Sequence, residues 1–473
     1  MPIAFDNSYA RLPDRFYSYQ MPTRVAAPEI VKLNSELAEE IGVNPDLLTA
    51  DILSGNEIPE GAEPIAMAYG GHQFGGWNPQ LGDGRAILLG EVVGPDGVRR
   101  DIQLKGSGKT MFSRNGDGRA TLGAVLREYL VSEAMAALGL PTTRALAAVT
   151  TGEKIMREGY ERGAVLTRVA QSHIRVGTFQ YYFARNDVEA LQLLTDHVIE
   201  RHYPQAAATE NPTRAMLDSI IGRQAELVAR WMLLGFIHGV MNTDNSAVSG
   251  ETIDYGPCAF MDVFHPETVF SSIDRQGRYA WQKQPEIAHW NMAQLAQALS
   301  PVLGDDAEDE AQEALSKFAG KFSETFYNGF AAKIGLSGDT PDNRTVITDL
   351  MSVMAKGEVD FTLFFRRLTL GVDLGDFSAV RAMFYDPKII DAWFEKWVHA
   401  TAKLSLMQKS NPIFIPRNHR VEEVIVAANS GDLEPFNKLH DVLSKPYDEQ
   451  PENTEYENAP KPEEVVHATF CGT

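Results

Sequence analysis

The stretch HGVMNTDN at His238–Asn245, followed by DYGP at Asp254–Pro257, decides how this chain is interpreted. It comes directly after an apolar periodic pattern that predicts a helix over Met216–Ile237. Asn245 and Asp254 carry the hard oxygen ligands that Mg²⁺ prefers when it also binds phosphate oxygens. We therefore expect a loop here that holds a metal ion and the phosphates of a nucleotide.

Two further side chains of this stretch are candidates for acid–base chemistry. His238 continues the apolar stripe of the preceding helix through Trp231 and Leu234, which favours a packed core histidine over a catalytic one. Asp244 is the nearest carboxylate that can accept a proton from an attacking hydroxyl. Asn-Thr-Asp-Asn and Asp-Tyr-Gly-Pro are also typical of Asx turns, and a turn is compatible with a site.

Upstream, a glycine-dense stretch at Gly70–Arg85 leads into a predicted β-hairpin. Its strands, Ala86–Val93 and Val98–Lys105, are joined by a Pro-Asp-Gly turn. The glycines allow the backbone to approach a ligand closely, although such stretches are often ordinary turns. Lys105 ends the second strand, where a kinase-like fold carries the lysine that pairs with nucleotide phosphates. The alternative is a solvated lysine at a strand end.

A kinase-like fold also needs a glutamate on the next helix to hold this lysine. The pattern predicts that helix over Thr121–Leu138, and it contains both Glu128 and Glu133. Periodicity places Glu133 within the apolar stripe and Glu128 at its border, so periodicity alone favours Glu133. The aspartate that kinases carry two residues after the loop histidine is missing, since position 240 is Val240.

Composition and charge limit the partners of the chain. It has 473 residues and a formal net charge of −21, which disfavours nucleic acid and anionic membranes. Arg114, Arg119, Arg168 and Arg175 flank polar or glycine-rich segments, and each alone is typical of a surface charge. The first residues do not form a signal-peptide pattern, and the apolar runs are too short to span a bilayer. We therefore expect a soluble cytoplasmic protein.

The order of the patterns predicts an α+β fold with four parts. These are a wrapping segment at 1–63, a mixed α/β lobe at 64–178, a larger helical lobe at 179–444 and an acidic, proline-rich tail at 445–473. Further helices are expected at Pro28–Ile41 and Val188–His202, and further strands at Lys154–Arg157 and Gly163–Val169. The tail is expected to wrap the surface or to be disordered.

A set of longer motifs, taken together, resembles the selenoprotein O family over nearly the whole chain. The motifs are GGHQFG at Gly70–Gly75, LGDGR at Leu81–Arg85, QLKGSGKT at Gln103–Thr110, SRNGDGRA at Ser113–Ala120, LREYL at Leu126–Leu130, HGVMNTDN, DYGP, and NPIFIPRNH at Asn411–His419. The resemblance implies a protein-kinase-like two-lobed fold, with a mixed α/β N-lobe and a larger helical C-lobe. It also implies that ATP binds in a flipped orientation. AMP, rather than the γ-phosphate, would then pass to Ser, Thr or Tyr hydroxyls of other proteins or of the enzyme itself, with release of pyrophosphate.

The same resemblance assigns roles to individual residues. ATP contacts fall on Gly82, Gly84, Arg85, Lys105, Asp117, Gly118, Arg168, Arg175 and Asp254. The metal ion, Mg²⁺ or Mn²⁺, falls on Asn245 and Asp254, and Asp244 becomes the proton acceptor. Glu128 becomes the partner of Lys105, against the periodicity argument. The cations of the arginines suit the charge that develops on departing pyrophosphate.

Two other classes of function use almost the same residue types. A kinase would transfer the γ-phosphoryl group, and only the orientation of the nucleotide separates it from an AMP transferase. An inactive ATP-binding scaffold is favoured by the missing aspartate at position 240, but the retention of Lys105, Asp244 and both metal residues counts against it. The sequence identifies neither the protein substrates nor the oligomeric state.

The chain has two cysteines, Cys258 and Cys471. They are too few for a disulfide framework or for a zinc site built from cysteines. The family resemblance implies that Cys471 corresponds to a reactive C-terminal residue whose partner cysteine is expected around Phe270. Cys258 lies well before that position, so pairing between Cys258 and Cys471 stays open.

Overall fold

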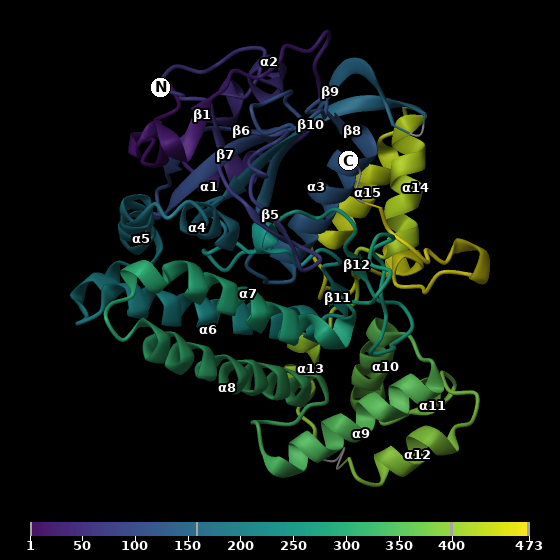
Figure 1. The fold of residues 1–473 in the computed structure, drawn as a ribbon. Coiled ribbons are helices and arrows are strands. Elements are labelled where there is room, and N and C mark those ends of the chain that lie inside the picture. Colours follow the sequence, from purple (N-terminus) through teal and green to yellow (C-terminus); the bar gives the residue numbers. More distant parts are fainter. Residues whose placement is uncertain (1, 158, 398–400, 471–473) are drawn as a thin grey trace.

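An antiparallel sheet occupies one end of the molecule and long helices fill the other (Figure 1). Because it contains both this sheet and many helices, the chain is of mixed α and β structure. The computed structural model describes residues 2–157, 159–397 and 401–470. Cys471 lies outside the described residues, and Cys258 is buried.

The main sheet is built from strands that pair antiparallel with their neighbours. In spatial order they are β1 (Tyr17–Tyr19), β3 (Ile65–Met67), β6 (Ala86–Val93), β7 (Arg99–Lys105), β10 (Tyr160–Ala170), β9 (Arg144–Met156) and β2 (Glu29–Leu33), with β8 (Ala120–Thr121) paired to β10. The predicted hairpin is confirmed, because β6 and β7 pair antiparallel, and Gly97 adopts a φ of +76° in the turn between them. The strands expected at Lys154–Arg157 and Gly163–Val169 are parts of the longer β9 and β10.

The helix expected over Pro28–Ile41 is wrong in its first half. Strand β2 pairs with β9, and the short helix α1 (Ser35–Glu40) begins only after Asn34. The Asn34 side chain accepts a hydrogen bond from Leu37 N at 3.1 Å and so caps the helix. Ile30 is 41% exposed, so its helical spacing from Leu37 did not reflect a shared buried face.

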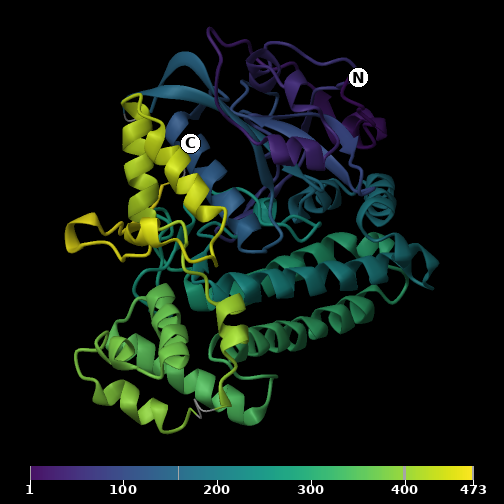
Figure 2. The same ribbon diagram turned by 180° about the vertical axis from the view of Figure 1, so that it is seen from behind.

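Helix α3 (Leu122–Ala137) confirms the helix predicted over Thr121–Leu138. Thr121 caps its N-terminus, and the Thr121 hydroxyl accepts a hydrogen bond from Ala124 N at 3.3 Å. One side of α3 packs on β9 and β10, and helices α14 (Asn418–Asn429) and α15 (Glu434–Leu443) cover the other (Figures 1 and 2). The C-terminal part of the chain therefore returns to complete the core around the sheet.

The remaining helices surround two further cores. They are α4 (Val176–Phe183), α5 (Val188–His202), α6 (Pro212–Leu233), α7 (Gln284–Leu299), α8 (Ala307–Lys333), α9 (Pro341–Gly357), α10 (Phe361–Leu374), α11 (Ser378–Arg381), α12 (Lys388–Phe394) and α13 (Leu404–Ser410). The short helix α2 (Ala50–Ser54) packs instead with α1 and the sheet. The prediction for α5 is confirmed. Helix α6 ends earlier than predicted, because Gly235 turns the chain with a φ of +70° into strand β11 (Phe236–Ile237). That strand pairs with β12 (Ala259–Phe260).

Described residues near both ends of the chain contact the body of the molecule. Near the N-terminus, the Phe16 ring lies 4.6 Å from the ring of Tyr182 in α4. Near the C-terminus, Thr469 N donates to Phe270 O at 2.7 Å, and the Thr469 hydroxyl donates to Pro257 O at 2.5 Å. Thr469 thus holds the end of the described tail to the segment that follows Asp254.

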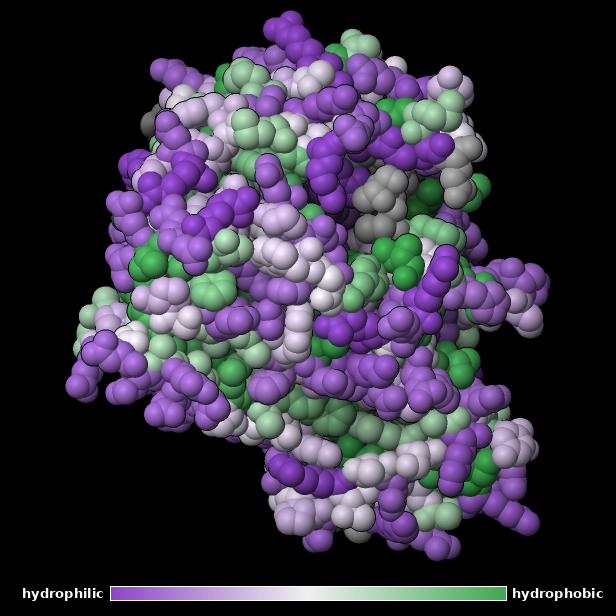
Figure 3. Space-filling model, viewed as in Figure 1, coloured by the Kyte–Doolittle hydropathy of each residue, from purple (hydrophilic) through white to green (hydrophobic). Residues whose placement is uncertain are grey.

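Hydrophilic side chains cover most of the face seen in Figure 3, with smaller hydrophobic areas between them. Among the described residues, no helix combines the length and apolar character that crossing a bilayer requires.

The C-terminal motif NPIFIPRNH has a structural explanation in Arg417. Its guanidinium, 1% exposed, pairs with Asp262 at 2.6 Å and with Asp360 at 2.9 Å. Asp360 also caps α10 by accepting a hydrogen bond from Leu363 N at 2.8 Å. Burial raises the pKa of Asp262 to about 6 even though Arg417 opposes that shift. Arg417 therefore joins the segment after β12, the start of α10 and the segment before α14.

Arg417→Ala should lower the free energy of unfolding by about 3–5 kcal/mol, because both carboxylates would be left without their buried cation. Chemical denaturation followed by tryptophan fluorescence measures the change. Arg381→Ala is the matched control, since the Arg381–Asp391 pair is 44% exposed on both sides. That change should cost at most about 1 kcal/mol. Equally small effects of both substitutions would contradict a stabilising role for Arg417.

Candidate functional site

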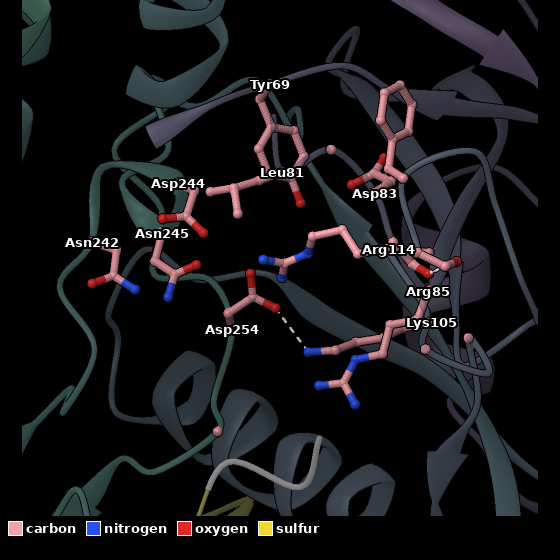
Figure 4. Close-up of a pocket in the computed structure, with 18 of the residues that line it drawn as sticks. Tyr69, Leu81, Asp83, Arg85, Lys105, Arg114, Asn242, Asp244, Asn245 and Asp254 are labelled. Atoms are coloured by element: carbon pink, nitrogen blue, oxygen red, sulfur yellow. Dashed lines mark hydrogen bonds and ion pairs between the residues drawn. The ribbon is translucent and has the colours of Figure 1, made fainter. Parts of the chain in front are cut away.

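A cavity of about 490 Å³ lies between the sheet and the loop that contains Asp244. The residues predicted for nucleotide, metal and proton transfer all line it. They are Gly82, Gly84, Arg85, Lys105, Asp117, Gly118, Arg168, Arg175, Asp244, Asn245 and Asp254. Figure 4 shows Asp244, Asn245 and Asp254 on one side of the cavity and Arg85, Lys105 and Arg114 on the other. Acceptor and cationic groups thus face each other across one space.

Lys105 joins three separate parts of the chain at the end of β7. Its Nζ lies 2.6 Å from Glu128 Oε2 on α3 and 2.8 Å from Asp254 Oδ1 on the loop after β11. Lys105 is therefore not a solvated strand-end lysine. The periodicity argument for Glu133 is wrong, because Glu133 binds Arg144 at 2.8 Å and 2.9 Å instead. Both glutamates are largely buried, so the apolar stripe did not distinguish them.

Arg168 completes this ion cluster from strand β10. Its Nη1 lies 2.7 Å from Asp254 Oδ1 and 3.2 Å from Glu128 Oε1. Its remaining donors are held by Gln103 Oε1, at 2.6 Å from Nη2 and 3.2 Å from Nε. Arg168 is 2% exposed, so the sequence's suggestion of a lone surface charge is wrong. A buried guanidinium needs this complete set of partners, because desolvation of an unpaired charge is costly.

Asp254 adopts an unusual backbone conformation. Its φ of +65° lies in the left-handed region, which few residues other than glycine occupy. Burial favours the neutral carboxyl, but Lys105, Arg168 and Arg175 outweigh it and hold the pKa of Asp254 well below its usual range. Asp254 is therefore a carboxylate, and its strained backbone directs it toward the cations.

A second arginine, Arg175, lies at the start of α4 and is 1% exposed. Its Nη1 lies 3.3 Å from Asp83 Oδ1, and its Nη2 lies 3.8 Å from Asp254 Oδ2. The Tyr69 ring lies under the guanidinium, 4.3 Å from Arg175 Cζ. Sequence reasoning missed Asp83, although a carboxylate between Gly82 and Gly84 was a visible signal. Asp83 is 1% exposed and also accepts a hydrogen bond from Gln103 Nε2 at 3.2 Å.

Asp244 is held from one side only. Its Oδ2 accepts a hydrogen bond from Gln73 Nε2 at 2.9 Å. Its Oδ1 is buried and accepts no hydrogen bond from the described residues. Burial raises the pKa of Asp244 to about 6, against the lowering effects of Gln73 and Arg175. An unsatisfied buried carboxylate oxygen is costly, so it marks a place where a bound group donates a proton or a hydrogen bond.

The oxygen atoms around Asn245 suit a hard divalent cation. Asn245 Nδ2 donates to Val240 O at 3.0 Å, which orients the amide and leaves its carbonyl oxygen as a ligand. The hydrogen bonds to Asp254 described above fall on Oδ1, whereas Oδ2 has the longer ion pair with Arg175 at 3.8 Å. The described residues contain no group of three or more His, Cys, Asp or Glu that would hold a metal by itself. A cation bound here would therefore need further oxygens, such as those of phosphates.

The glycines of the cavity are required by close packing between loops. At Gly82, with a φ of +68°, an added Cβ would lie 2.2 Å from Phe112 Cγ. At Gly118, with a φ of +70°, it would lie 2.1 Å from Gly108 O. The neighbouring Asp117 is paired with Arg157 at 2.8 Å. These contacts hold the segment around Phe112 and Gly118 against Gly82, Gly108 and Arg157, and this segment forms one wall of the cavity.

His238 does not reach the cavity. It is 1% exposed, its ring centroid lies 5.3 Å from that of Trp231, and its Nε2 lies 2.9 Å from Ile253 O. Burial lowers its pKa. The interpretation as a packed core histidine is confirmed.

Comparison with known proteins agrees with this geometry. The family model described as protein adenylyltransferase SelO matches residues 1–444. The chain is 58% identical to a protein nucleotidyltransferase YdiU of Bradyrhizobium sp. (strain ORS 278), over 99% of both chains. It is 56% identical to proteins of the same name from Rhodopseudomonas palustris (strain HaA2) and Methylorubrum extorquens, again over 99% of both chains. The chain therefore belongs to the SelO family of protein adenylyltransferases.

Proposed function

We propose that this protein transfers AMP from ATP to Ser, Thr or Tyr hydroxyls of proteins and releases pyrophosphate. The observation that carries the proposal is the buried cluster of Lys105, Glu128, Arg168 and Asp254 beside Asp244, one of whose carboxylate oxygens has no hydrogen-bond partner among the described residues. Family membership supports the same reaction.

We also propose that the fold is a protein-kinase-like arrangement of two lobes. In this interpretation the sheet and α3 form the N-lobe, and the helices from α4 onward form most of the larger C-lobe. The order of the site supports it: a strand ends in Lys105, the next helix carries Glu128, and a later loop carries Asn245 and Asp254. The boundaries expected from the sequence, at residues 63, 178 and 444, are modified in this proposal: β1 and β2 of the first segment belong to the N-lobe sheet, and α14 and α15 pack on α3.

The cavity provides the charges that a triphosphate needs. Lys105, Arg168, Arg175 and Arg85 would bind its phosphate oxygens, and the backbones at Gly82, Gly84, Asp117 and Gly118 would form the enclosing walls. Asn245 and Asp254 would hold Mg²⁺ or Mn²⁺, which when bound supplies positive charge next to the phosphates. Arginines buried in advance also stabilise charge on departing pyrophosphate without reorganising.

Asp244 would accept the proton of the attacking hydroxyl at Oδ1. The hydroxyl oxygen forms a bond to the α-phosphorus as the bond from that phosphorus to the oxygen of pyrophosphate breaks. Pyrophosphate leaves with the electron pair, and the proton remains on Asp244. A pKa of about 6 suits this role, because the group is mainly ionised at neutral pH yet basic enough to take a proton.

Position-specific labelling of ATP tests the reaction. Label at the α-phosphate should become attached to protein in a Mg²⁺- or Mn²⁺-dependent way, whereas label at the γ-phosphate should appear in released pyrophosphate. Electrophoresis of the protein and chromatography of the products measure the two. Protein labelled from the γ-phosphate would instead establish a kinase, and labelling from neither position would establish a scaffold.

Asp254→Asn should lower AMP transfer by at least about 100-fold, because the charge that binds the metal and orders the phosphates is lost while the shape is kept. The variant should also lose the additional thermal stabilisation that a non-hydrolysable ATP analogue gains from Mg²⁺. Asp391→Asn, on the exposed pair with Arg381, is the control and should behave as wild type. Near-normal transfer by a folded Asp254→Asn protein would show that the metal assignment is incorrect.

A further inference from the structure

A small hairpin from the glycine-dense stretch reaches the loop of the proposed base. It consists of β4 (Gly71–Gln73) and β5 (Gly76–Asn78), which pair antiparallel with His72 opposite Trp77. We propose that Gln73 is a positioning residue that fixes the carboxylate of Asp244 for proton transfer. This inference rests on the proposed function and assigns the GGHQFG motif a role in it.

Backbone contacts place the hairpin firmly against the base loop. His72 N donates to Thr243 Oγ1 at 2.7 Å, and Phe74 N donates to Asn242 Oδ1 at 3.1 Å. The Tyr279 hydroxyl donates to the same Asn242 oxygen at 2.6 Å. The backbone of the hairpin therefore binds the side chains of the two residues that precede Asp244.

Glycine permits this close approach. An added Cβ at Gly71 would lie 3.0 Å from Thr243 Oγ1 and 3.2 Å from Asp244 N. On the other side, an added Cβ at Gly177 would lie 2.2 Å from Gly70 O, which is shorter than any tolerated contact. The start of the hairpin is thus enclosed between the start of α4 and the loop that contains Asp244. This packing fixes the position of the backbone that carries Gln73.

The orientation of the Gln73 amide follows from its second partner. Asn78 Nδ2 donates to Gln73 Oε1 at 3.2 Å, so the other end of the amide, Nε2, is the atom directed at Asp244 Oδ2 at 2.9 Å. An amide donor cannot take a proton from a substrate. It can hold Oδ2 and thereby leave Oδ1 as the basic atom, which is the oxygen without a described partner.

Gln73→Met removes the donor but keeps a side chain of similar length. It should lower kcat for AMP transfer by about 10- to 100-fold, since a small misplacement of a reacting group has effects of this size. The KM for ATP and the melting temperature should stay near the wild-type values. Gln192→Met is the matched control, because it removes a Gln–Asp hydrogen bond of 2.8 Å, to Asp196, on the exposed surface of α5. The control should leave kcat unchanged.

A double-mutant cycle with Asp244→Asn separates positioning from a general structural effect. Asp244→Asn alone should lose most transfer, and adding Gln73→Met should then change the residual rate by less than about 2-fold, because the two residues act as one unit. If Gln73→Met does not fold, Asn78→Leu tests the same contact by releasing the Gln73 amide, and its effect should also disappear in the Asp244→Asn background.

An equal loss from Gln73→Met in both backgrounds would overturn the inference, as would full activity of Gln73→Met when Asp244→Asn is inactive. In both cases the proposed reaction would stand. Full activity of Asp244→Asn would instead remove Asp244 as the base, and the positioning role with it. Alpha-labelled ATP that fails to label the wild-type protein would reject the proposed function itself.

Discussion

The site depends on the ion cluster of Lys105, Glu128, Arg168 and Asp254, because its members come from four elements that are distant in the sequence. Each charge is buried enough that leaving it unpaired would cost several kcal/mol. The position of β7, β10, α3 and the loop after β11 is therefore constrained by one shared set of contacts. The strained backbone at Asp254 is tolerated because the surrounding charges determine where its carboxylate must lie.

Around this cluster the cavity divides into parts with different chemistry. Arg175 and Asp83 extend the buried ionic contacts toward Tyr69. There the two charges neutralise each other, and the Arg175 guanidinium packs on the Tyr69 ring. Asp244, in contrast, has a raised pKa and an oxygen without a described partner. Two aspartates ten positions apart thus differ in character: Asp254 is a permanent anion among cations, and Asp244 can exchange a proton. Environment, not residue type, makes the distinction.

Local patterns explain what the sequence predicted well. The β6–β7 hairpin, α3 and α5 follow from turn chemistry and periodicity over neighbouring residues. Contacts between distant segments explain the failures. Strand β2 forms because it pairs with β9. Glu133 binds Arg144, whereas Glu128 binds Lys105, and neither contact is visible in the local pattern. Gln73 and Asp244 are distant in the sequence and come into contact only in the folded chain. Periodicity identifies the buried face of a helix, but it does not identify which buried glutamate meets a lysine.

The packing of α14 and α15 on α3 has a consequence for the order in which the protein folds. Arg127 of α3 and Glu422 of α14 form an ion pair across 295 positions of sequence. While the chain is being synthesised, the face of α3 that these helices cover therefore stays exposed until the residues up to Leu443 have left the ribosome. Closing so long a loop is slow, and an exposed apolar helix invites association during that time. The helix that carries Glu128 thus gains this part of its packing only after α14 and α15 have been synthesised.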